Sequence, residues 1–236
     1  MQDRSSQLLE SAYVLHRSPF RETSLFIDLF TCSHGMLRLL AKGAHRGKAT
    51  RASVLQPFLL LKVSWTGKTE LPIFTGGEIV SGDHLAGGAM LCGLYVNELL
   101  IRLLPPMDPH PLLFNHYQQV VAQLGCEDNP EPILRRFELD LLNELGYAPV
   151  LNVDAESGNS VIPDGYYDYI PEHGPVECSY HGKAFRGKTL LALNQRQLIQ
   201  EDEQKEAKRL MRSLINQVLG NRPLKSRELF RYTRFE

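Results

Sequence analysis

The chain has 236 residues and a formal net charge of −1 at pH 7, enough length for one large domain or two small ones with a full hydrophobic core. The near-zero charge excludes a histone-like polycation, and four scattered cysteines without a Cys-x-x-Cys pair argue against a disulfide scaffold. The sequence shows no secretory signal pattern and no apolar run of membrane-spanning length. We therefore expect a cytoplasmic protein without a membrane partner.

Residues 11–81 have the alternating pattern of short antiparallel strands. The expected strands are residues 25–30, 36–41, 59–65, 70–75 and 78–81. About five short strands in roughly 70 residues favour a small closed barrel over a sandwich, and the five-stranded OB-fold fits this size. We expect Phe26 and Trp65 to lie in the barrel core.

The remaining residues, 82–236, predict a helical bundle. Helical spacing of apolar residues marks four helices, at about residues 89–104, 113–124, 134–145 and 207–218. Residues 147–190 interrupt the bundle with turn-rich sequence and short strands. The sequence therefore predicts an α+β protein in which an OB-fold domain, residues 1–81, precedes a helical domain with an irregular insertion.

Charge is unevenly distributed along the chain. Residues 1–51 contain eight Lys or Arg against four Asp or Glu, and residues 205–236 contain nine against three. Residues 38–51 carry five cations and no acid in a glycine-punctuated stretch. A basic loop between strands can follow a phosphate backbone, because each neutralised phosphate releases a counterion. The alternative is an ordinary solvated surface loop.

Basic residues near aromatic residues in the predicted barrel favour binding of nucleic acid, in which cations track phosphates and bases stack on rings. The candidate DNA-binding residues are Arg17, Arg21, Arg38, Lys42, Arg46, Lys48, Arg51 and Lys62.

Gly182-Lys-Ala-Phe-Arg-Gly187-Lys188-Thr189 matches the complete P-loop pattern, which predicts a nucleotide-binding hydrolase as the alternative function. The context argues against it, because no buried strand precedes Gly182 and no βαβ alternation follows Thr189. The other interpretation is a hairpin with basic tips. No other hydrolase motif is present, so we expect a non-enzymatic protein.

A structural zinc site requires four ligands. Cys178-Ser-Tyr-His181 offers two at a workable spacing and His173 a possible third, but the sequence supplies no convincing fourth. We therefore expect no metal and no other cofactor.

Several strings, in this order along almost the whole chain, resemble the RecO family of bacterial recombination mediators. They are Ala12-Tyr-Val-Leu-His-Arg, Glu22-Thr-Ser-Leu, Leu40-Ala-Lys-Gly-Ala, Leu55-Gln-Pro-Phe, Leu94-Tyr-Val-Asn-Glu-Leu-Leu, Arg135-Arg-Phe-Glu-Leu, Leu145-Gly-Tyr and Pro223-Leu-Lys-Ser-Arg-Glu-Leu. The resemblance implies an OB-fold and a helical domain, with a zinc-binding insertion in some members. Here the insertion retains only Cys178, so the chain is similar to the zinc-free branch.

The resemblance also implies function and partners. It implies binding of single- and double-stranded DNA, annealing of complementary strands, and work with RecR to load RecA onto strands coated by single-stranded-DNA-binding protein (SSB), in the cytoplasm at the nucleoid. A plain adaptor with an incidental basic loop is a third possibility.

The family docks the acidic, Phe-ended tail of SSB on its helical domain. The candidates here for binding its carboxylates are Arg135, Arg136, Lys208, Arg209 and Arg212. An apolar gap between helices would hold the Phe. For Arg135 and Arg136, an ordinary i,i+3 pair on the helix, for instance Arg135 with Glu138, is an equally good interpretation.

Overall fold

The structure is a computed structural model. It describes residues 6–44, 53–67, 71–82, 84–198, 200–220 and 222–232. The backbone forms two compact units. One contains residues 1–126 with 224–236, and the other contains residues 127–223. The sequence predicts a domain boundary between residues 81 and 82, where the barrel would give way to the helices. This boundary stays a prediction.

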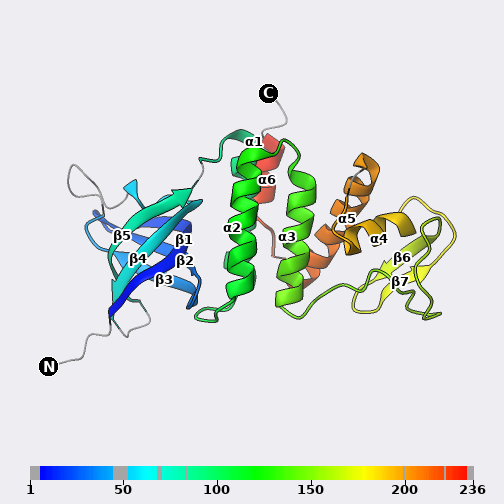
Figure 1. Cartoon of the computed structure of the whole chain (residues 1–236), viewed down its shortest axis with the longest axis horizontal. Coiled ribbons are helices and arrows are strands. Elements are labelled where there is room, and N and C mark those ends of the chain that lie inside the picture. Colours follow the sequence, from blue (N-terminus) through cyan, green and yellow to red (C-terminus); the bar gives the residue numbers. More distant parts are fainter. Residues whose placement is uncertain are drawn as a thin grey trace. The chain divides into compact units, whose positions relative to one another are not determined.

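Five strands form the predicted barrel (Figure 1). They are β1 (Ser6–Phe20), β2 (Ser24–Thr31), β3 (Gly35–Ala41), β4 (Leu59–Thr66) and β5 (Ile73–Gly82). The barrel is closed in the order β1-β2-β3-β5-β4, with a parallel contact between β3 and β5 and antiparallel pairs elsewhere. The strand number and closure are those of the OB-fold. The sequence predicts two separate strands at residues 70–75 and 78–81, but the structure has one strand there, β5, which joins the described end of the first segment, from Ile73, to the second.

Strand alternation fills the barrel interior with aliphatic side chains. In β2, Leu25, Ile27 and Leu29 point inward and are buried with the core cluster, which also includes Trp65. The prediction for Trp65 is confirmed. The prediction for Phe26 is wrong, because its position between Leu25 and Ile27 turns its ring to the outer face of the sheet.

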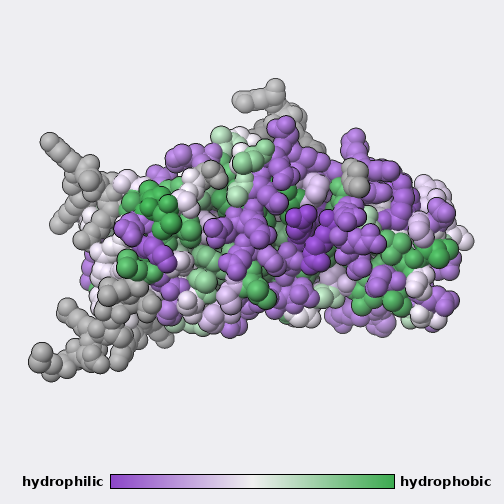
Figure 2. Space-filling view, viewed as in Figure 1, coloured by the Kyte–Doolittle hydropathy of each residue, from purple (hydrophilic) through white to green (hydrophobic). Residues whose placement is uncertain are grey.

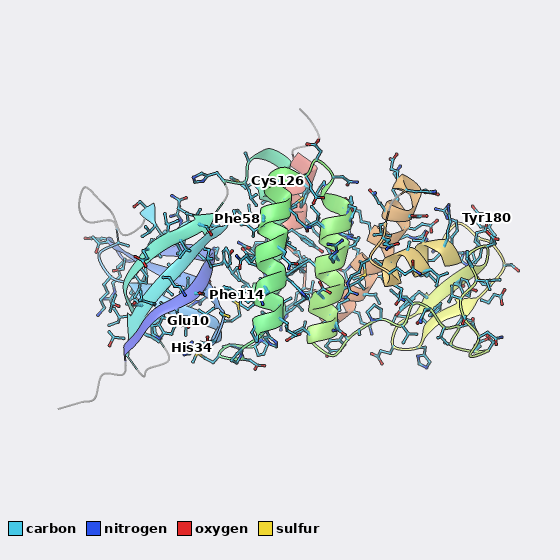
Figure 3. The ribbon with its side chains drawn as sticks, in the orientation of Figure 1. Glu10, His34, Phe58, Phe114, Cys126 and Tyr180 are labelled. Carbon is cyan, nitrogen blue, oxygen red and sulfur yellow. The ribbon has the colours of Figure 1, made fainter. Side chains whose placement is uncertain are left out.

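Helices α1 (Gly87–Leu103) and α2 (Pro111–Cys126) belong to the same unit as the barrel. Figure 3 shows Phe114 of α2 directed toward the barrel. Its ring centroid lies 5.5 Å from that of Tyr13 in β1 and 5.4 Å from that of Phe30 in β2. Tyr117 of α2 adds a contact of 4.9 Å with Tyr13. The outer face of β1 and β2 is therefore buried at this end.

The C-terminal helix α6 (Ser226–Tyr232) packs on α1. The Glu98 carboxylate accepts hydrogen bonds from the Lys225 amide at 3.0 Å and from the Ser226 amide and hydroxyl at 2.8 and 2.7 Å. Burial tends to raise the pKa of Glu98, but these hydrogen bonds and Arg102 lower it overall. The carboxylate thus satisfies the free amides at the start of α6.

The second unit contains α3 (Pro130–Glu144), α4 (Gly187–Asn194) and α5 (Glu201–Val218). Three short strands, β6 (Tyr166–Ile170), β7 (Gly174–Glu177) and β8 (Phe185–Arg186), form a sheet in the order β7-β6-β8. The four predicted helices are α1, α2, α3 and α5, and the predicted turns and strands of the insertion are also present. The sequence missed α4 and α6, which span only 8 and 7 residues.

One carboxylate organises the insertion. Asp154 accepts hydrogen bonds from the Ser157 amide and hydroxyl, at 2.6 and 2.7 Å, and from the Glu177 amide of β7 at 2.6 Å. The two Ser157 bonds and the Glu177 bond lower the pKa of Asp154. The ionised side chain therefore joins an early turn of the insertion to its sheet.

Candidate nucleic-acid interface

Three polar side chains form a row across the outer face of the barrel. The strand register places His16 of β1 opposite Asp28 of β2, and Asp28 opposite Arg38 of β3. The guanidinium of Arg38 binds both carboxylate oxygens of Asp28, at 2.6 and 3.0 Å, and the hydrogen bond raises the pKa of Arg38. Because 60% of the Arg38 side chain is exposed, its outer edge remains open to solvent.

An aromatic pair occupies the adjacent part of this face, toward the β1–β2 turn. The ring centroids of Phe20 and Phe26 lie 4.4 Å apart. The guanidinium carbon of Arg21 lies 5.1 Å from the Phe20 ring centroid. Lys42 directly follows β3 and is exposed. Opposite Phe26 lies Leu40, which is half-buried. This end of β1, β2 and β3 thus combines cations with half-buried rings, and we name Phe20, Arg21, Phe26, Arg38 and Lys42 the barrel patch.

Lys62 lies apart from the barrel patch, on β4, which borders β1 on the side away from β2. It is half-buried, donates a hydrogen bond of 2.9 Å to the Ser11 hydroxyl and pairs in register with Glu78. Beside it on β5, Ile79 and Val80 are 49% and 53% exposed, and Figure 2 shows apolar surface over this part of the barrel. This surface combines exposed apolar side chains with one cation, Lys62, which already donates a hydrogen bond to Ser11.

Arg17 is exposed and donates a hydrogen bond of 3.3 Å to the Leu55 carbonyl. It pairs in register with Ile27, whose side chain is inside the barrel, so Arg17 does not share the face of Arg38. Arg46, Lys48 and Arg51 lie outside the residues that the structure describes.

The P-loop interpretation is wrong for a reason in the backbone. In a P-loop, backbone amides point at phosphate. Here the Gly187 amide donates to the Gly165 carbonyl at 2.8 Å, and the Lys188 amide donates to the Pro163 carbonyl at 2.9 Å. A Cβ on Gly187 would lie 1.8 Å from the Ile162 carbonyl oxygen, so this glycine allows close packing against protein. The hairpin interpretation fails too, because β8 pairs with β6 and continues directly into α4.

The side chains of this segment are also engaged by acids. Arg186 pairs with Asp202 and with Glu206 at 2.7 Å. The buried Thr189 hydroxyl donates to Glu206 at 2.7 Å, and Lys188 lies 3.6 Å from Asp202. Two carboxylates therefore occupy the place that phosphate would need, and they repel it.

The predicted SSB-tail residues divide into engaged and open groups. Arg135 is 4% exposed and binds Glu138 at 2.8 Å, the i,i+3 pair of the second interpretation. Arg209 donates to the carbonyls of Gly182 and Ala184, at 3.3 and 2.7 Å, and lies over the Phe185 ring.

Lys208 pairs with Glu131. Arg136 and Arg212 are exposed, and neither side chain has a hydrogen bond or ion pair among the described residues. These two arginines are the open group.

A cavity of about 360 Å³ lies in the second unit, between α3, α5 and the β6–β7 turn. Its lining includes Leu142, Tyr147, Val150, Leu214 and Val218, and contains no Lys or Arg. Tyr169 also lines it, and burial raises the pKa of this phenol to about 12. The lining also includes the polar residues Glu172, His173 and Gln217, so the cavity has both apolar and polar walls. Any cationic contact from Lys or Arg has to come from outside the lining.

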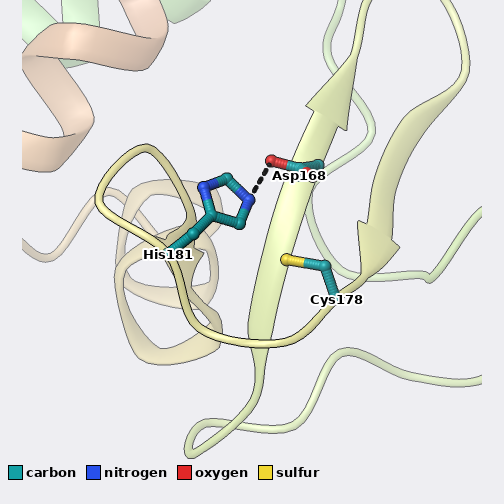
Figure 4. Close-up of side chains that lie close together, drawn as sticks. All are labelled: Asp168, Cys178 and His181. Carbon is teal, nitrogen blue, oxygen red and sulfur yellow. Dashed lines mark ion pairs between the residues drawn. The ribbon is translucent and has the colours of Figure 1, made fainter.

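The insertion brings three possible metal ligands together. Ligand atoms of Asp168, Cys178 and His181 lie within 4.8 Å of one another, with 3.0 Å between His181 and Asp168 (Figure 4). The third group is Asp168 of β6, and His173, the third ligand that the sequence suggests, does not belong to this set. A closed structural zinc site needs four ligands, and the described part of the chain offers three here, two of them exposed. This set does not fit such a site.

A closed five-stranded barrel with this strand order is an OB-fold, an architecture whose members commonly bind oligonucleotides. The family model described as Recombination protein O N terminal matches residues 5–82, and that described as Recombination protein O C terminal matches residues 84–228. The chain therefore belongs to the RecO family of DNA repair proteins.

Individual relatives agree with this assignment. The chain is 47% identical to the DNA repair protein RecO of Methylococcus capsulatus over 230 residues, which are 97% of this chain and 95% of the relative. It is 43% identical to the protein of that name from Azoarcus sp., over 93% of each chain. A relative of the same name from Coxiella burnetii is 43% identical over 94% of this chain and 96% of its own. Within the described residues, no helix combines the length and apolarity needed to cross a membrane.

Proposed function

We propose that this repair protein is a non-enzymatic mediator that binds single- and double-stranded DNA and anneals complementary strands. With RecR, it helps to load RecA onto single strands coated by SSB, in the cytoplasm at the nucleoid. The observation that carries the proposal is the barrel patch, in which two half-buried rings, one of them in contact with Arg21, share one end of β1, β2 and β3 with Arg38 and Lys42. Contacts between such cations and the phosphates bind the DNA backbone without depending on the base sequence.

Annealing follows from charge screening. Two complementary strands repel each other through their phosphates, and a cationic surface that neutralises some phosphates on one strand lowers that repulsion. Asp28 moderates the effect, because it already neutralises part of the charge of Arg38. A moderate affinity suits annealing, since the protein has to release the paired product.

The second unit supplies the proposed SSB contact. Arg136 and Arg212 have guanidinium groups free to bind the carboxylates of an acidic tail. The cavity bordered by Leu142 and Leu214 can take a terminal Phe ring. Arg135 and Arg209 contribute indirectly in this proposal, because Arg135 supports α3 and Arg209 holds the insertion loop.

The test of DNA binding is fluorescence anisotropy of a labelled single strand across a salt series. We expect log Kd to rise linearly with log salt, with a slope of about 0.7 for each phosphate contact. Absence of binding at low salt would sink the proposal. A binding constant that does not change with salt would favour the adaptor with an incidental basic loop.

The SSB contact is tested with a labelled acidic peptide that ends in Phe. We expect Arg136→Glu and Arg212→Glu to weaken its binding, while Lys225→Glu, an exposed change in the other unit, leaves it unchanged. Removing the terminal Phe from the peptide should weaken binding to wild type. Equal binding by all these variants would place the tail elsewhere.

The mediator role is tested by RecA filament formation on SSB-coated single strands. We expect the chain with RecR to shorten the lag before filaments form, and the chain without RecR to give a smaller effect. An unchanged lag with both proteins present would remove the RecA-loading part of the proposal and leave DNA binding and annealing standing.

A further inference from the structure

The two rings of the barrel patch lie outside the barrel core. Phe26 points outward from β2, as the inward positions of Leu25 and Ile27 require. Phe20 ends β1 and pairs in register with Ser24. Barrel packing therefore does not explain why large aromatic side chains occupy these positions.

The opposite end of the same strands shows what a structural use of such rings looks like. There the outward side chains Tyr13 and Phe30 are 3% and 0% exposed, because Phe114 and Tyr117 of α2 cover them. The rings at the turn end are only partly buried. Among the described residues, the ring and cation contacts of Phe20 are with Phe26 and Arg21.

The turn after β1 positions the cation at this ring pair. Arg21 has a φ of 55°, in the left-handed region that residues other than glycine rarely adopt. Its guanidinium carbon lies 5.1 Å from the Phe20 centroid, within the range of a cation–π contact. A strained residue of this kind is often found at a binding site, where the fold maintains a costly conformation.

We propose that Phe20 and Phe26, with Arg21, form a subsite for an unpaired nucleobase. The proposal deepens the proposed function and rests on it. Every base has a π face that can stack on an aromatic ring without regard to sequence. The surrounding cations Arg21, Arg38 and Lys42 select an anionic ligand, which favours a nucleotide over an apolar peptide. Bases inside a duplex are already stacked, so the subsite discriminates for single strands.

The decisive probe is a strand whose bases have been removed. An abasic oligonucleotide of the same length keeps every phosphate and lacks every stacking face. We expect wild type to bind the abasic strand at least fivefold more weakly than the normal strand, because stacking of one base contributes about 1–3 kcal/mol.

Phe20→Ala should lose that preference, binding the normal strand at least fivefold more weakly and the abasic strand as before. Phe26→Ala should behave in the same way. Tyr180→Ala is the matched control, because Tyr180 is an exposed aromatic residue of the other unit (71% exposed) and should leave both affinities unchanged. Phe20→Trp retains a stacking ring and should restore the preference, with circular dichroism verifying that each variant is folded.

Phe20→Trp also supplies a direct signal, since the single natural tryptophan, Trp65, is buried in the barrel. After subtraction of the wild-type signal, a normal strand should quench the new fluorophore, and an abasic strand should not. Equal quenching by both strands would overturn the subsite.

The outcomes separate the two proposals. If wild type binds normal and abasic strands equally, and Phe20→Ala binds as wild type does, DNA binding stands and the base subsite is wrong. If wild type binds neither strand at low salt, the proposed function itself fails and the subsite with it.

Discussion

The barrel patch and the segment from Gly182 to Thr189 use cations in opposite ways. In the barrel patch, Lys42 is exposed and Arg38 shares one carboxylate while most of its side chain remains in solvent. In the insertion, Arg186 pairs with the carboxylates of Asp202 and Glu206. Lys188 lies close to Asp202, and Thr189 donates a hydrogen bond to Glu206. The sequence of the insertion matches a phosphate-binding motif and the sequence of the barrel patch matches none, yet the barrel patch has the open charge.

This difference shows that a cation can bind a ligand only when no acidic group close to it in space already neutralises it. Acids from α5, about 15 to 20 residues further along the chain, neutralise the cations of the insertion. No local motif contains that information.

Removing the cations of the barrel patch should weaken DNA binding most. For the triple change Arg21→Gln, Arg38→Gln and Lys42→Gln, we expect about hundredfold weaker binding of a single strand at low salt and a salt slope shallower by about 2. Anisotropy across a salt series measures both.

The matched control for that triple variant changes three exposed cations of the other unit, Lys183→Gln, Lys205→Gln and Arg222→Gln, and removes the same formal charge. If the control weakens binding as much as the barrel variant does, DNA responds to total charge and the barrel patch has no special role.

Glu206→Ala should destabilise the second unit and spare DNA binding. The change leaves the buried Thr189 hydroxyl and the Arg186 amide without their acceptor, at a cost of about 2 kcal/mol. Faster proteolysis of the insertion would reveal it. Glu201→Ala, an exposed change on the same helix, is the control and should have little effect.

Asp28→Asn should strengthen DNA binding about threefold at low salt. The amide cannot neutralise Arg38, whose side chain is 60% exposed, and does not repel phosphate. A charge pair near the protein surface contributes up to about 1 kcal/mol. Unchanged or weaker binding by a folded variant would show that Asp28 does not restrain the barrel patch. Titration of a labelled strand at 50 mM and 200 mM salt separates this charge effect from a loss of structure.

The smallest expected effect is on stability at acid pH. The folded pKa values of Glu98 and Asp154 are both lowered, so their stabilisation is present above the unfolded values, about 4.3 and 3.9. It is lost as the pH falls through the lower folded values. Thermal unfolding at several pH values should show Glu98→Gln and Asp154→Asn less stable than wild type at pH 7. That difference should shrink below about pH 4.

Much of the fold is visible in the sequence because its signals are local. Alternation in residues 59–65 and the helical spacing from Ala207 to Val218 predict β4 and α5 directly. Short helices escape this reasoning: α6 depends on Glu98, which lies 128 residues away from Ser226 in the chain. Phe26 was misassigned because a ring in a strand gives no indication of which face is inward until the register is known.

The OB-fold barrel, the order of the main helices and the family can all be predicted from the sequence, because alternation, helical period and matching strings are patterns along the chain. Which cations are open depends on the tertiary structure. Arg38 lies on the outer face of β3 and Lys42 is exposed directly after this strand, while Arg186 and Lys188 meet the acids of α5. The physical reason is that electrostatic pairing depends on distance in space, and folding brings charges together from positions that no local pattern connects.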